Sequence, residues 1–221
     1  TGHRYSSSIY PIQHDHYDRA FAGTSDHDVV SVLDAAIAVL QGRPAPAPVD
    51  IQDQTEALLL LAHLVGDVHQ PLHVGSVYLD NDGQLVDPGP SGQPVDRRID
   101  TRGGNAIEDG GTNLHAQWDV IPASLDPLAL PAAMLKAARA VAATPGPQAQ
   151  WPTRWASESV IAAREAYGGL TFTRTGAARP GNWVAVVTDR PAHEARRAAL
   201  QERQLTLAGA RLAQLLNSVW R

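Results

Sequence analysis

The sequence predicts an all-α protein with one long irregular insert. Three observations predict this class. Apolar residues recur at helical spacing in several segments, no strand–helix–strand alternation or fixed-period repeat is present, and a single long stretch is rich in Gly, Asp and Pro. The chain has 221 residues. We expect residues 1–221 to form a single domain, because one domain commonly holds roughly 100–200 residues.

The helices are predicted from periodicity and from their end signals. Residues 1–27 mix Ser, Pro, Gly and His without periodicity, so we expect a packed loop there. The expected helices cover residues 28–41, 51–68, about 113–119, 131–143, 152–167 and about 191–220. Asp28 is the expected N-cap of the first and Gly42 its stop. The helix over 51–68 is apolar on nearly every side and ends before Pro71, so we expect it to be the buried central helix.

The irregular insert spans residues 74–112. Its Gly, Asp and Pro content is typical of a long excursion over the surface. Short alternating stretches such as Val77-Tyr78-Leu79 predict a small β-hairpin that turns at Asn81-Asp82-Gly83.

Composition limits the function classes. The formal net charge of −5 gives no basic field that would hold nucleic acid through its phosphates alone. The longest apolar run, Ala57 to Val65, is far shorter than the roughly 20 residues that cross a bilayer, so we expect no membrane span. The chain has no cysteine, so a bound metal would need His, Asp, Glu or backbone ligands.

A first candidate metal pair lies on the central helix. His63 and Asp67 are four residues apart, so their side chains share one helix face and can reach one cation. The alternative is that the two side chains satisfy each other inside a helical core. Gly66 between them favours a ligand or a second backbone that approaches closely, since glycine costs a helix about 1 kcal/mol relative to alanine.

A second pair repeats this arrangement. His115 and Asp119 are also four residues apart, and His73 follows Pro71 closely enough to turn back toward the first pair. Two such pairs on separate segments are hard to explain as accident, and a sulfur-free set of imidazoles and carboxylates suits a hydrolytic zinc cluster. The sequence therefore predicts a metal site.

Other polar residues have two interpretations. Gly103-Gly104-Asn105 is either a turn in which Asn tolerates positive φ or a place where backbone approaches substrate. His69 lies on a different helix face from His63, so we expect it to be structural or to support a ligand.

These motifs resemble those of a known family. The segment 63–73, written H-x-x-G-D-x-H-Q-P-L-H, is followed by Gly103-Gly104-Asn105 and then by residues 113–119, N-L-H-x-x-W-D. In order and spacing they resemble the S1/P1 nucleases, which are trinuclear zinc phosphodiesterases. The resemblance implies a helical fold related to zinc-dependent phospholipase C and the hydrolysis of RNA and single-stranded DNA to 5′-nucleotides, often with 3′-nucleotidase activity. It also implies a secreted or periplasmic protein, and we expect a monomer.

The resemblance also implies roles for single residues. His63 and Asp67 would bind one zinc of a close pair, with Asp67 bridging toward another. His73, His115 and Asp119 would bind a further zinc. Asp67 and Asn105 would act in catalysis, and Gly104 and Asn105 would contact substrate.

The family also uses an upstream histidine, for which His3 fits the expected distance better, although His16 precedes an aromatic residue, Tyr17. Further family ligands, an N-terminal tryptophan, a histidine and an aspartate, have no counterpart in this sequence. We therefore expect residues 1–221 to be the larger part of a protein whose N-terminal helix, which would carry these ligands, is missing, cleaved or supplied as a separate piece. The rival interpretations are a phospholipase C-type zinc hydrolase, which an exposed apolar rim would favour, and a non-catalytic zinc-binding remnant.

Overall fold

The computed structural model describes residues 10–122, 125–126, 128–175 and 183–219. Most of the regular structure in these residues is helical. The α-helices are α1 (Val29–Leu40), α2 (Gln54–His69), α3 (Pro71–Val74), α4 (Leu114–Asp119), α5 (Ala132–Ala140), α6 (Trp151–Tyr167) and α7 (Arg190–Val219). The strands are β1 (Tyr10–Pro11), β2 (Gly75–Ser76), β3 (Ile107–Asp109), β4 (Thr112–Asn113), β5 (Leu170–Arg174) and β6 (Trp183–Val187).

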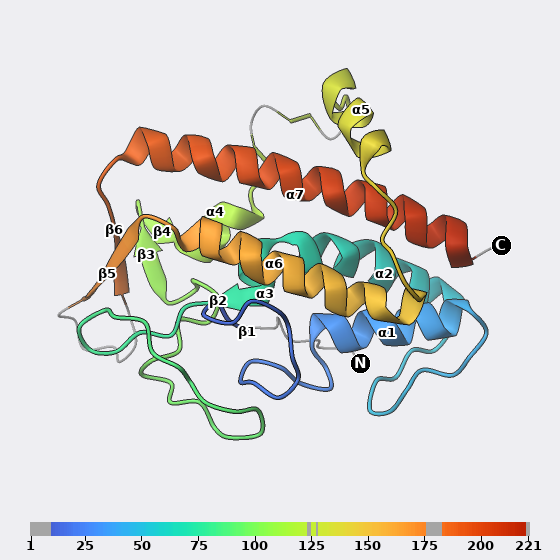
Figure 1. The fold of residues 1–221 in the computed structure, drawn as a ribbon, viewed down its shortest axis with the longest axis horizontal. Helices are drawn as coiled ribbons and strands as arrows, with labels where there is room; N and C mark the ends of the chain where they lie inside the picture. The colour runs from blue at the N-terminus through green and yellow to red at the C-terminus, as the bar shows by residue number, and fades with distance from the viewer. Residues whose placement is uncertain (1–9, 123–124, 127, 176–182, 220–221) are drawn as a thin grey trace.

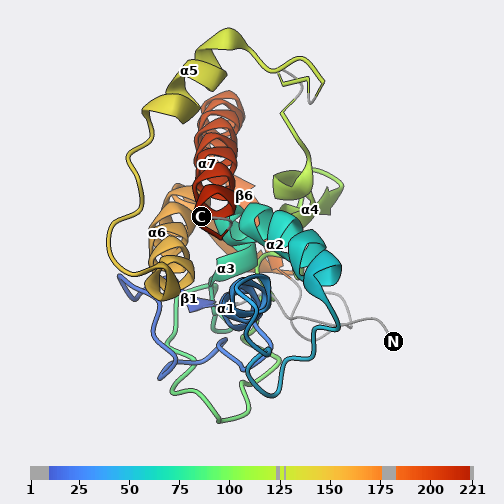
Figure 2. The same ribbon diagram turned by 90° about the vertical axis from the view of Figure 1, so that its right-hand side faces the viewer.

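The long helices form the main core. α1 packs on α2, α2 packs on α7, and α6 contacts both α1 and α2. In Figure 1, α6 and α7 run along the longest axis, with α1 and α2 at one end and the small sheet at the other. Figure 2 shows α5 on the far side of α7 from α1. No helix among the described residues has both the length and the apolar character needed to span a bilayer.

The helix ends follow the signals in the sequence. Asp28 caps α1, where its Oδ1 accepts the Ser31 N–H at 2.9 Å, and Gly42 follows the helix with a φ of 75°. Asp53 caps α2 in the same way through the Glu56 N–H, which places the start of α2 three residues later than expected. The predicted helices are thus present, with small shifts at their ends.

The predicted central helix, α2, is buried on one side only, so the expectation of a buried helix with an almost entirely apolar surface was wrong in this respect. Leu61, Leu64 and Val68 are buried, whereas Leu59 and His63, which share a face one turn apart, are exposed. The same face continues to Gly66, and it borders the cavity described below.

The structure also adds sheets to the predicted all-α class. β1 and β2 form a parallel pair, and a second sheet has the order β4-β3-β6-β5. β5 and β6 are antiparallel, with Phe172 opposite Ala185, and β6 runs parallel to β3. Their inward side chains, among them the fully buried Trp183, form a second hydrophobic core with α4, α6 and α7.

The insert includes two short hairpins. The predicted hairpin is present in minimal form, as one antiparallel bridge between Leu79 and Leu85 around a turn at 80–84. A tighter hairpin joins β3 to β4 through Gly110 and Gly111, whose φ angles are 61° and 90°. Two consecutive positive φ angles are what a two-residue hairpin turn requires, which explains the pair of glycines. α4 begins directly after this hairpin.

Candidate metal centre

The end of α2 positions the first predicted pair. His63 Nε2 lies 3.3 Å from Asp67 Oδ2, one helical turn away. Gln70 is the C-cap of α2 and the N-cap of α3, so the chain turns sharply between the two helices. This turn brings His73 back toward α2, and its Nδ1 lies 3.6 Å from the same Asp67 oxygen. Two imidazoles therefore approach one carboxylate oxygen.

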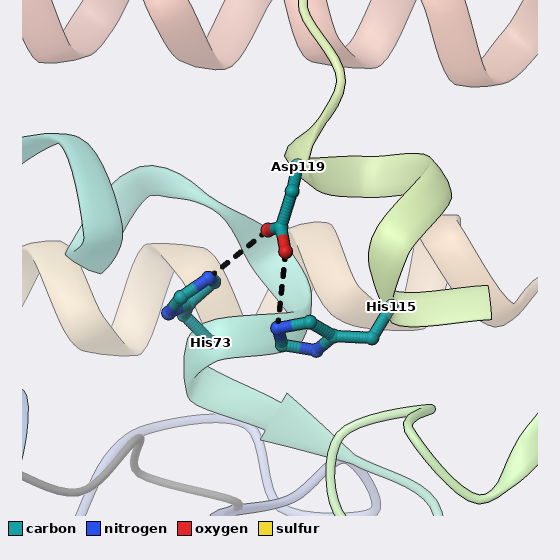
Figure 3. Close-up of side chains that lie close together, drawn as sticks. All are labelled: His73, His115 and Asp119. Carbon is teal, nitrogen blue, oxygen red and sulfur yellow. Dashed lines mark hydrogen bonds and ion pairs between the residues drawn. The ribbon is translucent and has the colours of Figure 1, made fainter. Parts of the chain in front are cut away.

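The second pair lies on α4 and meets the first through His73. His73 Nε2 is 3.1 Å from Asp119 Oδ1, and His115 Nε2 is 3.7 Å from Asp119 Oδ2. The rings of His73 and His115 lie 4.8 Å apart between centroids. Figure 3 shows the two imidazoles on the same side of the Asp119 carboxylate, each facing one of its oxygens.

Three of these residues form a compact set of potential metal ligands. One ligand atom from each of His73, His115 and Asp119 lies within 4.8 Å of the others. Two imidazole nitrogens and a carboxylate oxygen, without sulfur, form a donor set that zinc accepts in catalytic sites. The residues present fit the metal.

A glycine turn orients His115. Gly103 O accepts a hydrogen bond from His115 Nδ1 at 2.8 Å, which directs Nε2 toward Asp119. Arg102, Gly103 and Gly104 have φ angles of 54°, 60° and 87°. A Cβ at Gly104 would lie 3.0 Å from Leu72 Cδ2 and 3.3 Å from the backbone nitrogen of His115. The turn therefore packs directly against the residue that it orients. Positive φ thus falls on Arg102 and the glycines rather than on Asn105.

The environment favours the ligand forms of the side chains. Burial lowers the pKa of His115, although the hydrogen bond to Gly103 opposes this shift. The lowered pKa keeps the imidazole neutral. Burial opposes ionisation of Asp119, but the hydrogen bonds from Gln70 and His73 and the nearby His115 ring outweigh it and hold the pKa of Asp119 below the usual range. A neutral imidazole and an ionised carboxylate are the states that bind a metal.

The site opens into a cavity of about 410 Å³ between α2, α4 and α7. The polar part of the lining includes His63, Asp67, His73 and Asp119. The apolar part of the lining includes Val120, Ile121, Pro122 and Leu205. The cavity lining therefore combines potential metal ligands with exposed apolar side chains.

Other predicted site residues lie elsewhere. Asn105 donates from Nδ2 to Arg102 O at 2.9 Å and lines a separate cavity of about 180 Å³ with Trp183. Its catalytic role and the substrate contacts of Gly104 and Asn105 stay predictions. His3 lies outside the described residues. His16 is exposed and pairs with Asp15 at 2.7 Å, apart from the compact set.

His69, the last residue of α2, is buried and lines the inner part of the same cavity. Its Nδ1 donates to Val65 O at 2.7 Å, and its Nε2 accepts from Arg211 Nη1 at 2.8 Å. Burial and the neighbouring Arg211 charge lower the pKa of His69 to about 3, so the ring is neutral. Arg211 is itself paired with Glu158 of α6. This network joins α2, α6 and α7.

Sequence reasoning missed two glutamines that support the site. Gln70 donates from Nε2 to Asp119 Oδ1 at 2.9 Å. Gln201 on α7 donates from Nε2 to the carbonyls of Trp118 and Val120, at 3.2 and 3.0 Å, and also to that of Gln117. Gln70 lies within the motif at residues 63–73, so its position beside the predicted ligands could have indicated its role. No local sequence pattern distinguishes Gln201.

Comparison with known proteins agrees with this geometry. A protein family described as S1/P1 Nuclease matches residues 4–221, nearly the whole chain. A comparison with curated proteins gave no match. The family match covers every segment that supplies the metal-binding set, from α2 to α4. The chain belongs to the S1/P1 nuclease family, a family of hydrolases that cleave nucleic acids.

Proposed function

We propose that this protein is a zinc-dependent phosphodiesterase that hydrolyses RNA and single-stranded DNA to 5′-nucleotides and also acts as a 3′-nucleotidase. The observation that carries the proposal is the meeting of two His–Asp pairs, 63/67 and 115/119, through His73. A secreted or periplasmic, monomeric protein is part of the same proposal.

The ligand assignment follows the contacts. His73, His115 and Asp119 would hold one zinc, and His63 with Asp67 would hold part of another. Zinc, when bound, supplies Lewis acidity, an acidified water and the positive charge that a chain of net charge −5 lacks. Asp67 faces both His63 and His73, so its carboxylate ties the two groups of ligands together. Gly103 holds the His115 tautomer, and the cavity beside these side chains offers about 410 Å³ for a substrate.

We further propose that a separate N-terminal piece of the protein completes the cluster. Gly66 supports this, because it lies inside α2 at a cost of about 1 kcal/mol relative to alanine, and a Cβ there would meet nothing within 4 Å. His63 beside it is 62% exposed. This face of α2 can therefore receive a closely packed second segment. The intact mass of the natural protein, compared with that of residues 1–221, tests the proposal, and an equal mass with a full zinc complement would contradict it.

The decisive experiment combines metal content with turnover. We expect purified protein to contain zinc and to cleave single-stranded oligonucleotides, and we expect chelation to abolish cleavage until zinc is restored. His115→Ala should lose both the zinc of its group and cleavage. His27→Ala, on an exposed loop, is the matched control. Zinc binding without any turnover would identify a non-catalytic zinc-binding remnant and contradict the nuclease proposal.

A second candidate is a phospholipase C-type zinc hydrolase. The apolar part of the cavity lining favours it, because Val120 is 65% exposed and Ile121 and Leu205 are also exposed. Release of phosphocholine from lecithin vesicles, measured beside release of nucleotides from RNA under the same conditions, separates the two activities. Faster lipid than nucleotide turnover would favour the phospholipase.

A further inference from the structure

The side chain of Gln70 makes two hydrogen bonds, one as an acceptor and one as a donor. Its Oε1 accepts the Leu72 N–H at 2.5 Å, which caps α3. Its Nε2 donates to Asp119 Oδ1 at 2.9 Å. A backbone N–H can only donate and an ionised carboxylate can only accept, so the two partners together fix the orientation of the amide. Gln70 is therefore a directional link between the α2–α3 junction and α4.

Asp119 needs such a link. It is the last residue of α4, a helix of six residues, and its side chain is 48% exposed. Oδ1 also faces His73 at 3.1 Å, while Oδ2 faces His115 at 3.7 Å. Gln70 and His73 both contact Oδ1, which leaves Oδ2 facing His115.

We propose that Gln70 is a positioning residue for the metal centre, which sets the orientation of the Asp119 carboxylate and thereby its ability to bind zinc together with His73 and His115. The inference rests on the proposed zinc site and adds to it a residue that acts through a ligand. Partners of this kind, which hydrogen-bond to metal ligands, commonly contribute about 10–100-fold to metal affinity.

The two hydrogen bonds can be separated by substitution. Serine is a good N-cap, so Gln70→Ser keeps an acceptor for the first turn of α3 but is too short to reach Asp119. We expect this variant to retain its circular dichroism and to bind zinc about 10–100-fold more weakly than wild type, measured by competition with a chromophoric chelator. Gln148→Ser, at a partly exposed glutamine whose amide contacts Ser218, is the matched control and should bind zinc as wild type does.

A double-mutant cycle gives the inference its second test. If Gln70 acts through Asp119, then Gln70→Ser should change zinc affinity little once Asp119→Asn is present, so the two effects should be clearly non-additive. The cycle remains informative even if Gln70→Ser lowers stability, because a general loss of folding would add to the Asp119→Asn effect and would contradict the inference.

The outcomes distinguish the two proposals. Tight zinc binding by wild type and equally tight binding by Gln70→Ser would overturn the role of Gln70 and leave the proposed function standing. A wild-type protein that binds no zinc would overturn both. Weaker binding by Gln70→Ser, with no further loss in the Asp119→Asn background, is the expected result.

Discussion

The imidazole Nε2 of His73 lies 3.1 Å from Asp119 Oδ1, although 46 residues separate the two in the sequence. The other ring nitrogen of His73 faces Asp67 at 3.6 Å. One side chain thus joins the carboxylate at the end of α2 to the carboxylate at the end of α4. The proposed metal centre therefore relies on this ring to bring the two His–Asp pairs together.

Replacing His73 with glutamine should separate the two carboxylates. We expect zinc affinity to fall by at least about 100-fold, because even loss of an outer partner commonly costs about 10–100-fold, and cleavage to fall in parallel. Zinc stoichiometry and single-stranded DNA hydrolysis are the measurements. A variant that kept its full zinc content would show that His73 is not a ligand.

Substitution of Gly104 should destabilise the protein through a specific steric contact. Gly104→Ala would impose a φ of 87° on alanine and place its Cβ 3.0 Å from Leu72 Cδ2. We expect a loss of about 1–3 kcal/mol of unfolding free energy, measured by urea denaturation, together with weaker zinc binding. Gly89→Ala is the matched control, since its φ is 91° and its Cβ would meet nothing within 4 Å. Equal losses of unfolding free energy in both variants would show that the positive φ alone, and not the contact with Leu72, destabilises Gly104→Ala.

Removal of the Gln201 amide should loosen the end of α4. Gln201→Leu keeps most of the volume but withdraws the donor from the carbonyls of Trp118 and Val120. We expect a destabilisation of about 1–3 kcal/mol, because buried carbonyls lose their partner, and a parallel loss of zinc affinity. Thermal unfolding with and without zinc measures both. Unchanged zinc affinity in a destabilised variant would restrict Gln201 to a structural role.

Asp34 on α1 should make stability depend on pH. Burial, together with the neighbouring Asp28, raises the pKa of Asp34 to about 7, and Arg19 at 3.8 Å only partly opposes this. Since the unfolded-state pKa is the lower one, the unfolded state gives up its proton first. Stability is therefore lost as pH rises from about 4 to about 7 and is not recovered above that range.

Asp34→Asn should remove that dependence. We expect its melting temperature to exceed that of wild type by roughly 2–4 °C at pH 8, the shift that about 1 kcal/mol produces in a protein of this size, and by less at pH 5. Asp50→Asn, at an exposed position, is the control. An advantage that was the same at both pH values would contradict the assigned pKa.

Local patterns predicted the helices and both His–Asp pairs, because these features depend on spacing within one segment. The contacts that assemble the site depend on segments far apart. β5 and β6 were missed because each strand has only five residues and β6 is stabilised by pairing with Ile107–Asp109 of the insert. The partners of Gln201 and Arg211 were equally out of reach, since α7 meets α4 and α2 only after folding.

The Gly110–Gly111 turn has a consequence for how this protein can vary in length. Asn113 is both the partner of Glu108 in the β3–β4 ladder and the cap of α4. One extra residue in the turn that shifted this pairing would rotate α4 by about 100° relative to the sheet and carry His115 away from His73. Homologous chains should therefore accommodate insertions in the surface loop around residues 81–99 and keep this hairpin at a constant length.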